Sequence, residues 1–324
     1  MPWYDTPLAR RLGLRWPIIA APMAGGPSTP RLAAAVSAVG GLGSVAGAML
    51  APEELRAAVA EVRSRTQAPF AVNLFAPLPP PSAQGVPAWA AATGTRLPDP
   101  LPSARFAEQL AVVVAEQVPV FSFTFGIPPL AGVEAVTIGT ATTVAEAVAL
   151  ERAGVDAVVA QGYEAGGHRA TFLDPVDRSL VGTLALVPQV VDAVSVPVVA
   201  SGGIMDGRGI AAALALGAQA VQLGSAFLRC PEAGTSPAHR EALGQDTVVT
   251  RVLTGRHARA VRTALVDRLE ASGLEPPDYP LPRYLTPEAP MLAGQAGGLA
   301  RTLPAAELVA TLAAETDEAL ARLA

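Results

Sequence analysis

Two stretches with the same layout, ERAGVDAVVAQG (151–162) and LALGAQAVQLGS (214–225), decide the fold of this chain. In each, a helical pattern ends at a glycine, Gly154 or Gly217, and the apolar run that follows ends at a second glycine. Glycine enters the left-handed backbone conformation that stops a helix without a Cβ penalty. Each stretch therefore predicts a helix, a tight turn and a buried strand, the repeating junction of a parallel α/β protein.

The same alternation continues along most of the chain. Several of the apolar runs lack polar alternation, as is typical of parallel strands covered on both faces. Eight strand–helix units in about 225 residues match the size of a TIM (β/α)8 barrel, and a doubly wound open sheet is the alternative. The predicted strands are 17–21, 43–47, 70–75, 119–125, 134–139, 156–161, 197–201 and 220–224. The predicted helices include 52–64, 104–116, 143–153, 183–194 and 207–216.

Two regions fall outside this repeat. Residues 76–103 are rich in proline and small side chains, so we expect a lid or spacer inserted in a barrel core of residues 1–228. Residues 229–324 form a smaller C-terminal extension, which we expect to cover the active site. Its final helix is predicted from about Pro304 and should return to the barrel.

The uncharged run 32–51 is long enough to span a bilayer. It consists mostly of alanine and glycine, and Gly40, Gly41 and Gly43 interrupt it in the middle. We therefore interpret it as a buried helix, a glycine turn and a buried strand, and expect no membrane contact.

The composition limits what the protein can bind. The 324 residues carry a net charge of −5 with no basic block, which argues against nucleic-acid binding. Cys230 is the single cysteine, so neither an intrachain disulfide nor a cysteine metal cluster is expected, and a cytoplasmic location follows. The absence of lysine excludes a Walker A motif and Schiff-base chemistry. The three histidines show no zinc spacing, and His239 and His257 are expected to be exposed loop residues without a role.

Two glycine motifs follow the last two predicted strands. Ser201, Gly202 and Gly203 follow the seventh strand, and Gly224 and Ser225 follow the eighth. Loops at these positions of TIM barrels commonly form a phosphate site. Glycines let backbone N–H groups approach the anion, and a helix N-terminus adds partial positive charge. The two motifs together predict a phosphate-binding site.

Three amide side chains, Asn73, Gln161 and Gln222, lie on predicted strands. An amide both donates and accepts hydrogen bonds, so it suits the mixed edge of a flavin or purine ring. A buried amide that satisfies neighbouring backbone groups is the alternative for each of the three.

The stretch QGYEAGGHR (161–169) begins where the sixth strand ends, at the rim that carries catalysis in a barrel. Gly166 and Gly167 permit tight backbone geometry beside a ligand. His168 at this position predicts a general base that works near neutral pH. Two charged neighbours could orient the imidazole or could be solvated: Glu164 and Arg169.

Six blocks of the sequence resemble the nitronate monooxygenases, formerly called 2-nitropropane dioxygenases. The similarity runs from about Pro17 to Arg262, with a further echo at 293–295. It implies a TIM barrel with FMN that oxidises alkyl nitronates, and sometimes nitroalkanes, with O₂ to a carbonyl compound and nitrite. The blocks are APMAGGPSTPRLAAAVSAVGGLGS (21–44), AVNLF (71–75), FSFTFG (121–126), AQGYEAGGHRA (160–170), VVASGGI (198–204) and AVQLGSAFL (220–228).

The resemblance also implies roles for individual residues. His168 would be the catalytic histidine, either as a base or as an anchor for the nitro group, and Gln295 would close over the cofactor. The partners would be a small nitro compound and O₂. The flavin ring would face Ala21, Pro22, Met23, Asn73 and Gln161. The ribityl and phosphate end would lie by Gly166, Gly202, Gly203, Gly224 and Ser225, with Gln222 nearby.

The chain departs from the family pattern in ways that bear on the substrate rather than on FMN. Thr124 stands where a second histidine is common, and Ala170 where a glycine commonly follows the His-Arg pair. Met291 and Leu292 lie where a tryptophan often precedes the Gly-Gln pair. A carboxylated nitronate would require a cationic or donor-rich pocket. The candidates for such a pocket are Arg169, Tyr279, Arg283 and Tyr284.

Two other functions are compatible with these motifs. The flavin-dependent enoyl-acyl-carrier-protein reductases, which use NAD(P)H, share an EAGGH-like block and a Gly-Gly phosphate loop. Ser28, Thr29 and Pro30 and the VNLF block of this chain disfavour that family. A flavin-binding protein that has lost activity is the second alternative.

Overall fold

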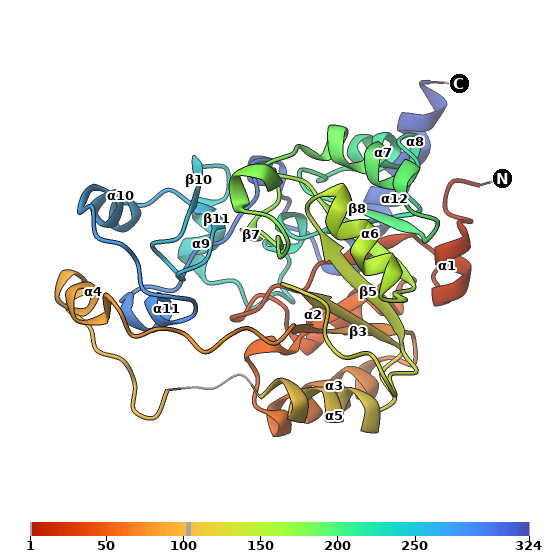
Figure 1. The fold of residues 1–324 in the computed structure, drawn as a ribbon. Coiled ribbons are helices and arrows are strands. Elements are labelled where there is room, and N and C mark those ends of the chain that lie inside the picture. The colour runs from red at the N-terminus through yellow and green to blue at the C-terminus, as the bar shows by residue number, and fades with distance from the viewer. Residues whose placement is uncertain (1, 102–104, 324) are drawn as a thin grey trace.

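The computed structural model describes residues 2–101 and 105–323, and its centre is a barrel of parallel strands (Figure 1). The strand order is β1-β9-β8-β6-β5-β4-β3-β2. A parallel bridge between Ile19 and Leu42 joins the two ends of this order. The closure confirms the predicted TIM barrel and excludes the open sheet. The eight strands are β1 (Ile18–Ala20), β2 (Gly43–Ala46), β3 (Phe70–Phe75), β4 (Val120–Thr124), β5 (Val136–Ala141), β6 (Ala157–Gln161), β8 (Val198–Ser201) and β9 (Ala220–Leu223).

Helices cover the outside of the barrel where the sequence predicted them. The left-handed glycines are confirmed, with φ of 85° at Gly154 and 94° at Gly217. The predicted helix 104–116 begins at Ala104, which lies outside the described residues, and is observed as Phe106–Ala115. The barrel helices are α2 (Pro30–Ala38), α3 (Pro52–Arg65), α5 (Phe106–Ala115), α6 (Val144–Arg152), α7 (Thr183–Ala193), α8 (Gly207–Ala215) and the predicted final helix α12 (Ala305–Ala321).

The uncharged run 32–51 folds as predicted. Most of it is α2, the glycine turn and β2, followed by the 3₁₀ turn η1 (Gly47–Met49). Both elements are largely buried, with Leu32 and Val36 1% and 0% exposed. Among the described residues, no helix is both long and apolar enough to cross a membrane.

One end of the barrel is closed and the other carries the loops. Helix α1 (Pro7–Leu12) packs its Leu8 and Leu12 against strand residues such as Ile138 and Val199 in one buried cluster. That cluster fills the end at which the strands begin. Ligand access is therefore left to the opposite end, where the strands finish and the loops are long, as in other TIM barrels.

A small outlying layer sits beside the open end and has its own core. Figure 1 shows α4, α10 and α11 on the side of the molecule away from α1. Trp89 is fully buried there, in a cluster with Leu269 and Leu285. The layer's antiparallel sheet runs β10-β11-β7. Its elements are α4 (Val86–Thr93), β7 (Gly167–His168), β10 (Thr247–Thr250), β11 (Ala258–Val261), α10 (Ala264–Ala271) and α11 (Leu281–Leu285). The short helix α9 (Pro237–Ala242) instead packs on the barrel core through Ala242.

This layer was underestimated from the sequence. The prediction treated 76–103 as a lid or spacer and assigned a single helix to 229–324, whereas α4 lies in the first region and several elements in the second. These elements are short, and their hydrophobic residues bury themselves against partners far away in the chain rather than along one helix face. A local hydrophobic period therefore gives little signal for them.

Candidate functional site

A cavity of about 260 Å³ opens where the parallel strands end. Residues at or just after each of the eight strands contribute to its wall, which places it at the catalytic mouth of the barrel. All but one of the predicted site residues line it. Those brought together are Ala21, Pro22, Met23, Asn73, Gln161, Gly166, Gly167, His168, Ser201, Gly202, Gly203, Gln222, Gly224 and Ser225.

The two glycine motifs form one wall of this cavity with free backbone donors. Within the described part of the chain, the N–H groups of Gly202, Gly203 and Gly224 donate to no protein acceptor. Gly202 and Gly224 are partly buried and Gly203 is exposed, so these N–H groups are open to an anion or to water at the cavity. The wall therefore has the donors that a phosphate requires.

Gly224 shows that this wall leaves room for a ligand. Its φ is −102°, so the backbone conformation does not require glycine. A Cβ added there would meet Ala21 Cβ at 3.6 Å and Met23 Sδ at 3.9 Å, which are ordinary contacts. Nothing in the protein itself therefore excludes a side chain at this position, and what a methyl group would take up is cavity space.

Glu164 holds the glycine wall in shape. Its carboxylate accepts hydrogen bonds from Thr183 N at 3.0 and 2.9 Å and from Thr183 Oγ1 at 2.8 Å. Thr183 Oγ1 also lies 3.0 Å from the carbonyl oxygen of Gly202. Glu164 thus ties its own loop to the start of α7 and the Gly-Gly turn, and it neither contacts His168 through a hydrogen bond nor remains free in solvent.

Gln295 is the predicted site residue that does not line the cavity. Its side chain is exposed, whereas its backbone N–H donates to Glu164 O at 3.0 Å. The neighbouring Gly294 lies against Gly166, where a Cβ on Gly166 would come within 2.5 Å of Gly294 N. Gly294 N also donates to Ser225 Oγ at 2.8 Å. The C-terminal segment thus covers the cavity with its backbone and not with the glutamine amide.

The amides on the strands are mostly engaged with the protein. Asn73 Nδ2 donates to Ser122 Oγ at 3.0 Å. Gln161 Nε2 donates to the His168 carbonyl oxygen at 3.0 Å, and Gln161 Oε1 accepts from Ala170 N at 3.0 Å. Gln161 therefore fixes the loop that carries the histidine as well as lining the cavity. The Gln222 side chain has no hydrogen bond within residues 2–101 and 105–323 and remains available to a ligand.

Arg169 has a structural role that the sequence analysis did not foresee. Its side chain is 1% exposed and does not line the cavity, so the suggestion of a solvated or substrate-binding residue is wrong. Its guanidinium donates to the carbonyl oxygens of Gly162 and Ser179 at 2.8 Å each, and to Gln161 Oε1 at 3.0 Å. Burial lowers its pKa to about 10. Arg169 therefore stabilises the loop that carries His168 through hydrogen bonds to its backbone and to Gln161.

His168 reaches the cavity from β7, where it pairs with Ala258 of β11. Its Nε2 lies 3.0 Å from Thr254 Oγ1. Burial lowers the imidazole pKa to about 3, and the positive charges of Arg256 and Arg283 add to this effect. The ring is therefore uncharged at neutral pH.

The proton of the Thr254 hydroxyl can serve only one of two acceptors. One is His168 Nε2, and the other is the carbonyl oxygen of Arg256 at 2.9 Å. When the hydroxyl donates to the carbonyl, Nε2 carries the imidazole proton and Nδ1 is an acceptor. When it donates to Nε2, Nδ1 carries the proton and is a donor. Rotation of one hydroxyl thus decides which tautomer the ligand meets.

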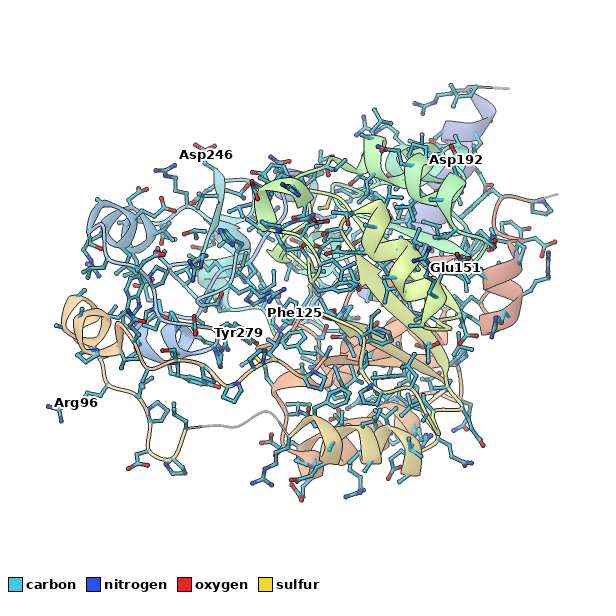
Figure 2. The ribbon with its side chains drawn as sticks, in the orientation of Figure 1. Arg96, Phe125, Glu151, Asp192, Asp246 and Tyr279 are labelled. Carbon is cyan, nitrogen blue, oxygen red and sulfur yellow. The ribbon has the colours of Figure 1, made fainter. Side chains whose placement is uncertain are left out.

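Aromatic rings surround the imidazole, and the sequence analysis missed most of them. Phe125 lies edge-on to His168 with ring centroids 5.6 Å apart, and Tyr279 does so at 5.4 Å. Phe75 packs on Phe125 at 4.5 Å. Phe125 has a φ of 77°, a left-handed conformation that is strained for a side chain other than glycine. Figure 2 shows Phe125 and Tyr279 between the barrel and the outlying layer.

Two arginines give this end of the cavity its charge. Arg256 Cζ lies 4.1 Å from the centroid of the Phe125 ring, and its Nη2 donates to the Thr171 carbonyl oxygen. Arg283 and Tyr279 line the cavity as the sequence suggested, whereas Tyr284 does not. Burial raises the pKa of Tyr279 to about 12, so its hydroxyl keeps its proton.

His239 corrects a second expectation. It is 6% exposed, lines the cavity, and its Nε2 lies 3.1 Å from the carbonyl oxygen of Leu292. Burial lowers its pKa. The expectation of an exposed histidine failed because α9 folds back over the barrel mouth, which its polar neighbours in sequence do not reveal. His257 is partly buried, and its carbonyl oxygen accepts from Arg169 N at 2.9 Å.

Comparison with known proteins identifies the family. The profile of the nitronate monooxygenase family matches residues 9–315. A "probable nitronate monooxygenase" of Staphylococcus saprophyticus is 40% identical over 297 residues, covering 85% of this chain and 83% of the relative. One of Staphylococcus aureus is 38% identical over 344 residues, covering 96% and 97%.

Solved structures agree with this assignment. The nitroalkane oxidase from Streptomyces ansochromogenes superposes with a TM-score of 0.90 at 39% identity, covering 98% of this chain and 99% of that one. FabK from Thermotoga maritima gives a TM-score of 0.77 at 31% identity, covering 98% of each chain. The chain therefore belongs to the nitronate monooxygenase family and is a flavin-dependent oxidoreductase.

Proposed function

We propose that the enzyme binds FMN at the barrel mouth and oxidises alkyl nitronates with O₂ to a carbonyl compound and nitrite. Two nitronate anions and one O₂ give two carbonyl molecules and two nitrite ions, which balances atoms and charge. The family match and the two staphylococcal relatives support a nitronate as substrate. The name of the Streptomyces neighbour supports the broader class of nitro compounds.

The residues present fit a flavin mononucleotide. The unpaired N–H groups of Gly202, Gly203 and Gly224 would hold its phosphate, and Gly224 leaves the space that a ligand would fill. Asn73 and Gln222 would face the polar edge of the ring. When bound, the flavin supplies the one-electron oxidation of the nitronate, and the protein supplies binding and orientation.

We assign His168 the role of a neutral hydrogen-bond donor to the nitro group. A base with a pKa of about 3 is too weak to remove the α-proton of a neutral nitroalkane efficiently, because the best catalytic pKa lies near the working pH. With the Thr254 hydroxyl turned to Nε2, the other ring nitrogen carries a proton that it can donate. The substrate would therefore enter as the preformed nitronate anion.

One observation carries this proposal: His168 and a cluster of free glycine N–H groups line the same cavity among the residues that the structure describes. The test is an absorbance spectrum of the purified protein, followed by anaerobic titration with ethyl nitronate, nitroethane and NADPH in separate cuvettes. We expect a bound flavin that ethyl nitronate bleaches much faster than nitroethane does. Rapid bleaching by NADPH would favour the reductase alternative, and a yellow protein inert to all three would favour the inactive one.

A further inference from the structure

The charge of the cavity is unbalanced. Arg283 lines it, and no aspartate or glutamate does among the residues that the structure describes. A cationic cavity without a carboxylate attracts anions and disfavours cations, and this field acts at short range inside a partly enclosed site. The charge distribution therefore favours an anionic ligand.

The Arg283 side chain is unpaired among the residues that the structure describes. Within the described ranges, its guanidinium makes neither a salt bridge nor a hydrogen bond. It lies beside Gly25 of the loop after β1, where an added Cβ would come within 2.9 Å of Arg283 Nη2. A guanidinium inside a cavity, with all of its donors unused, is the group that planar oxyanions bind in a bidentate manner.

Tyr279 adds a neutral donor at the same end. Its ring centroid lies 5.4 Å from that of His168 and 6.0 Å from that of Phe125. Its hydroxyl has no hydrogen-bond partner among the described residues. The hydroxyl stays protonated because burial raises its pKa to about 12. The aromatic rings on this wall give the hydroxyl apolar surroundings, where a charge-assisted hydrogen bond is stronger than in water.

We propose that Arg283, with the Tyr279 hydroxyl, forms an oxyanion subsite that selects the substrate by its negative charge. The inference rests on the proposed function, which it deepens by making Arg283 a specificity-determining residue. Two sources share the required chemistry, a planar pair of oxygens with one negative charge: the nitronate group itself, or a carboxylate carried elsewhere on the substrate. In either case, a neutral nitroalkane, which carries no net charge, gains less from Arg283 than an anion does.

The test compares variants of the flavin-loaded enzyme. Arg283→Gln removes the charge, Arg283→Lys restores it without the planar fork, and Tyr279→Phe removes only the hydroxyl. Arg65→Gln is the matched control, because Arg65 is an exposed arginine on α3, paired with Glu61 and outside the cavity. Far-ultraviolet circular dichroism and flavin occupancy establish that each variant is folded.

Two readouts are measured. Calorimetric titration with acetate, an unreactive planar oxyanion, gives a Kd without turnover, and steady-state kinetics give KM and kcat for ethyl nitronate and for a nitronate that carries a carboxylate. We expect Arg283→Gln to raise the acetate Kd, and the KM of at least one nitronate, by about 10- to 100-fold, the usual range for a charged hydrogen bond. Arg283→Lys should recover part of this loss, and Arg65→Gln should match the unmodified enzyme.

The two substrates identify the source of the anion. An increase in KM for both places the nitronate group on Arg283, and an increase for the carboxylated substrate alone places the carboxylate there. An Arg283→Gln enzyme whose acetate Kd and both KM values equal those of Arg65→Gln would overturn the inference while leaving the proposed function intact. Acetate binding that depends on Arg283 in an enzyme inert to both nitronates would instead overturn the function and retain the subsite.

Discussion

Replacing Gly224 by alanine distinguishes the effect of a side chain on FMN binding from its effect on the stability of the fold. A Cβ at this position would meet its nearest protein atoms at 3.6 and 3.9 Å, and the φ of −102° is accessible to alanine. The added methyl group would instead occupy cavity space beside an N–H group that we assign to the phosphate. We therefore expect Gly224→Ala to keep the stability of the apoprotein and to lose flavin affinity.

The expected changes in stability and in FMN affinity have opposite signs. At a position compatible with alanine, the smaller entropy of the unfolded chain raises the free energy of unfolding by about 0.4–1 kcal/mol. An extra methyl group pressed against a tightly fitting ligand costs about 1–3 kcal/mol. That cost raises the Kd for FMN by roughly 5- to 150-fold, since each 1.4 kcal/mol is about a factor of ten.

Gly154→Ala provides the matched control. Gly154 has a φ of 85° and open space around the Cβ position, and it lies at the turn before β6, away from the cavity. Alanine there should cost about 1–2 kcal/mol of stability through its left-handed conformation and leave flavin binding unchanged. Gly224→Ala should thus keep its stability and lose FMN affinity, whereas Gly154→Ala should lose stability and keep its FMN affinity.

The assays are a fluorescence titration of FMN into flavin-free protein and thermal unfolding of the same preparation. The reasoning is refuted if Gly224→Ala binds FMN as tightly as the unmodified protein, because the methyl group would then stand clear of the cofactor. It is equally refuted if Gly154→Ala weakens FMN binding to the same extent, because the loss would then reflect general destabilisation.

Three further predictions concern buried groups. The Glu146 carboxylate, which is fully buried, accepts from Thr142 and from the backbone of the loop after His168, so Glu146→Gln should lower the free energy of unfolding by at least about 3 kcal/mol in a urea titration. The His168 pKa falls from 6.5 to about 3 on folding, so the unfolded chain takes up a proton first and stability is lost as the pH drops from 6.5 towards 3. Between pH 7 and pH 5 the unfolding temperature of the unmodified protein should therefore fall further than that of His168→Asn, and equal falls would contradict the assigned burial. Burial raises the Cys230 pKa to about 12, so mass spectrometry should find this thiol unmodified by iodoacetamide in native protein at pH 8 and alkylated after denaturation.

Prediction from sequence succeeded where the signal is local. All eight barrel strands were placed within about two residues at either end, because each is a short, mainly apolar run bounded by turn residues. The two glycine motifs were placed at the cavity for the same reason, since they directly follow the last two strands, and their binding of a phosphate stays a prediction. His168 was predicted as a site residue because it follows the sixth strand and comes directly after two glycines.

Prediction failed where the fold, rather than the adjacent residues in sequence, supplies the partner of a side chain. Arg169 looked like a solvated or substrate-binding residue, but four hydrogen bonds to Gln161, Gly162 and Ser179 bury it. His239 looked exposed, but its imidazole meets Leu292, fifty-three positions further on. The charge and polarity of a side chain show which groups it can hydrogen-bond to. They do not show whether the folded protein places such a group beside it.

The linear pattern determined the barrel, its open end and the glycine wall, because these depend on which backbone conformations short runs of residues can adopt. Tertiary structure decided the chemistry of the opposite wall. Phe125, Thr254 and the pair Tyr279 and Arg283 come from three separate segments and meet around His168 only when the outlying layer docks on the rim. The uncharged state of the imidazole arises there as well, since burial and nearby cations are properties of a packed environment and not of the residue itself.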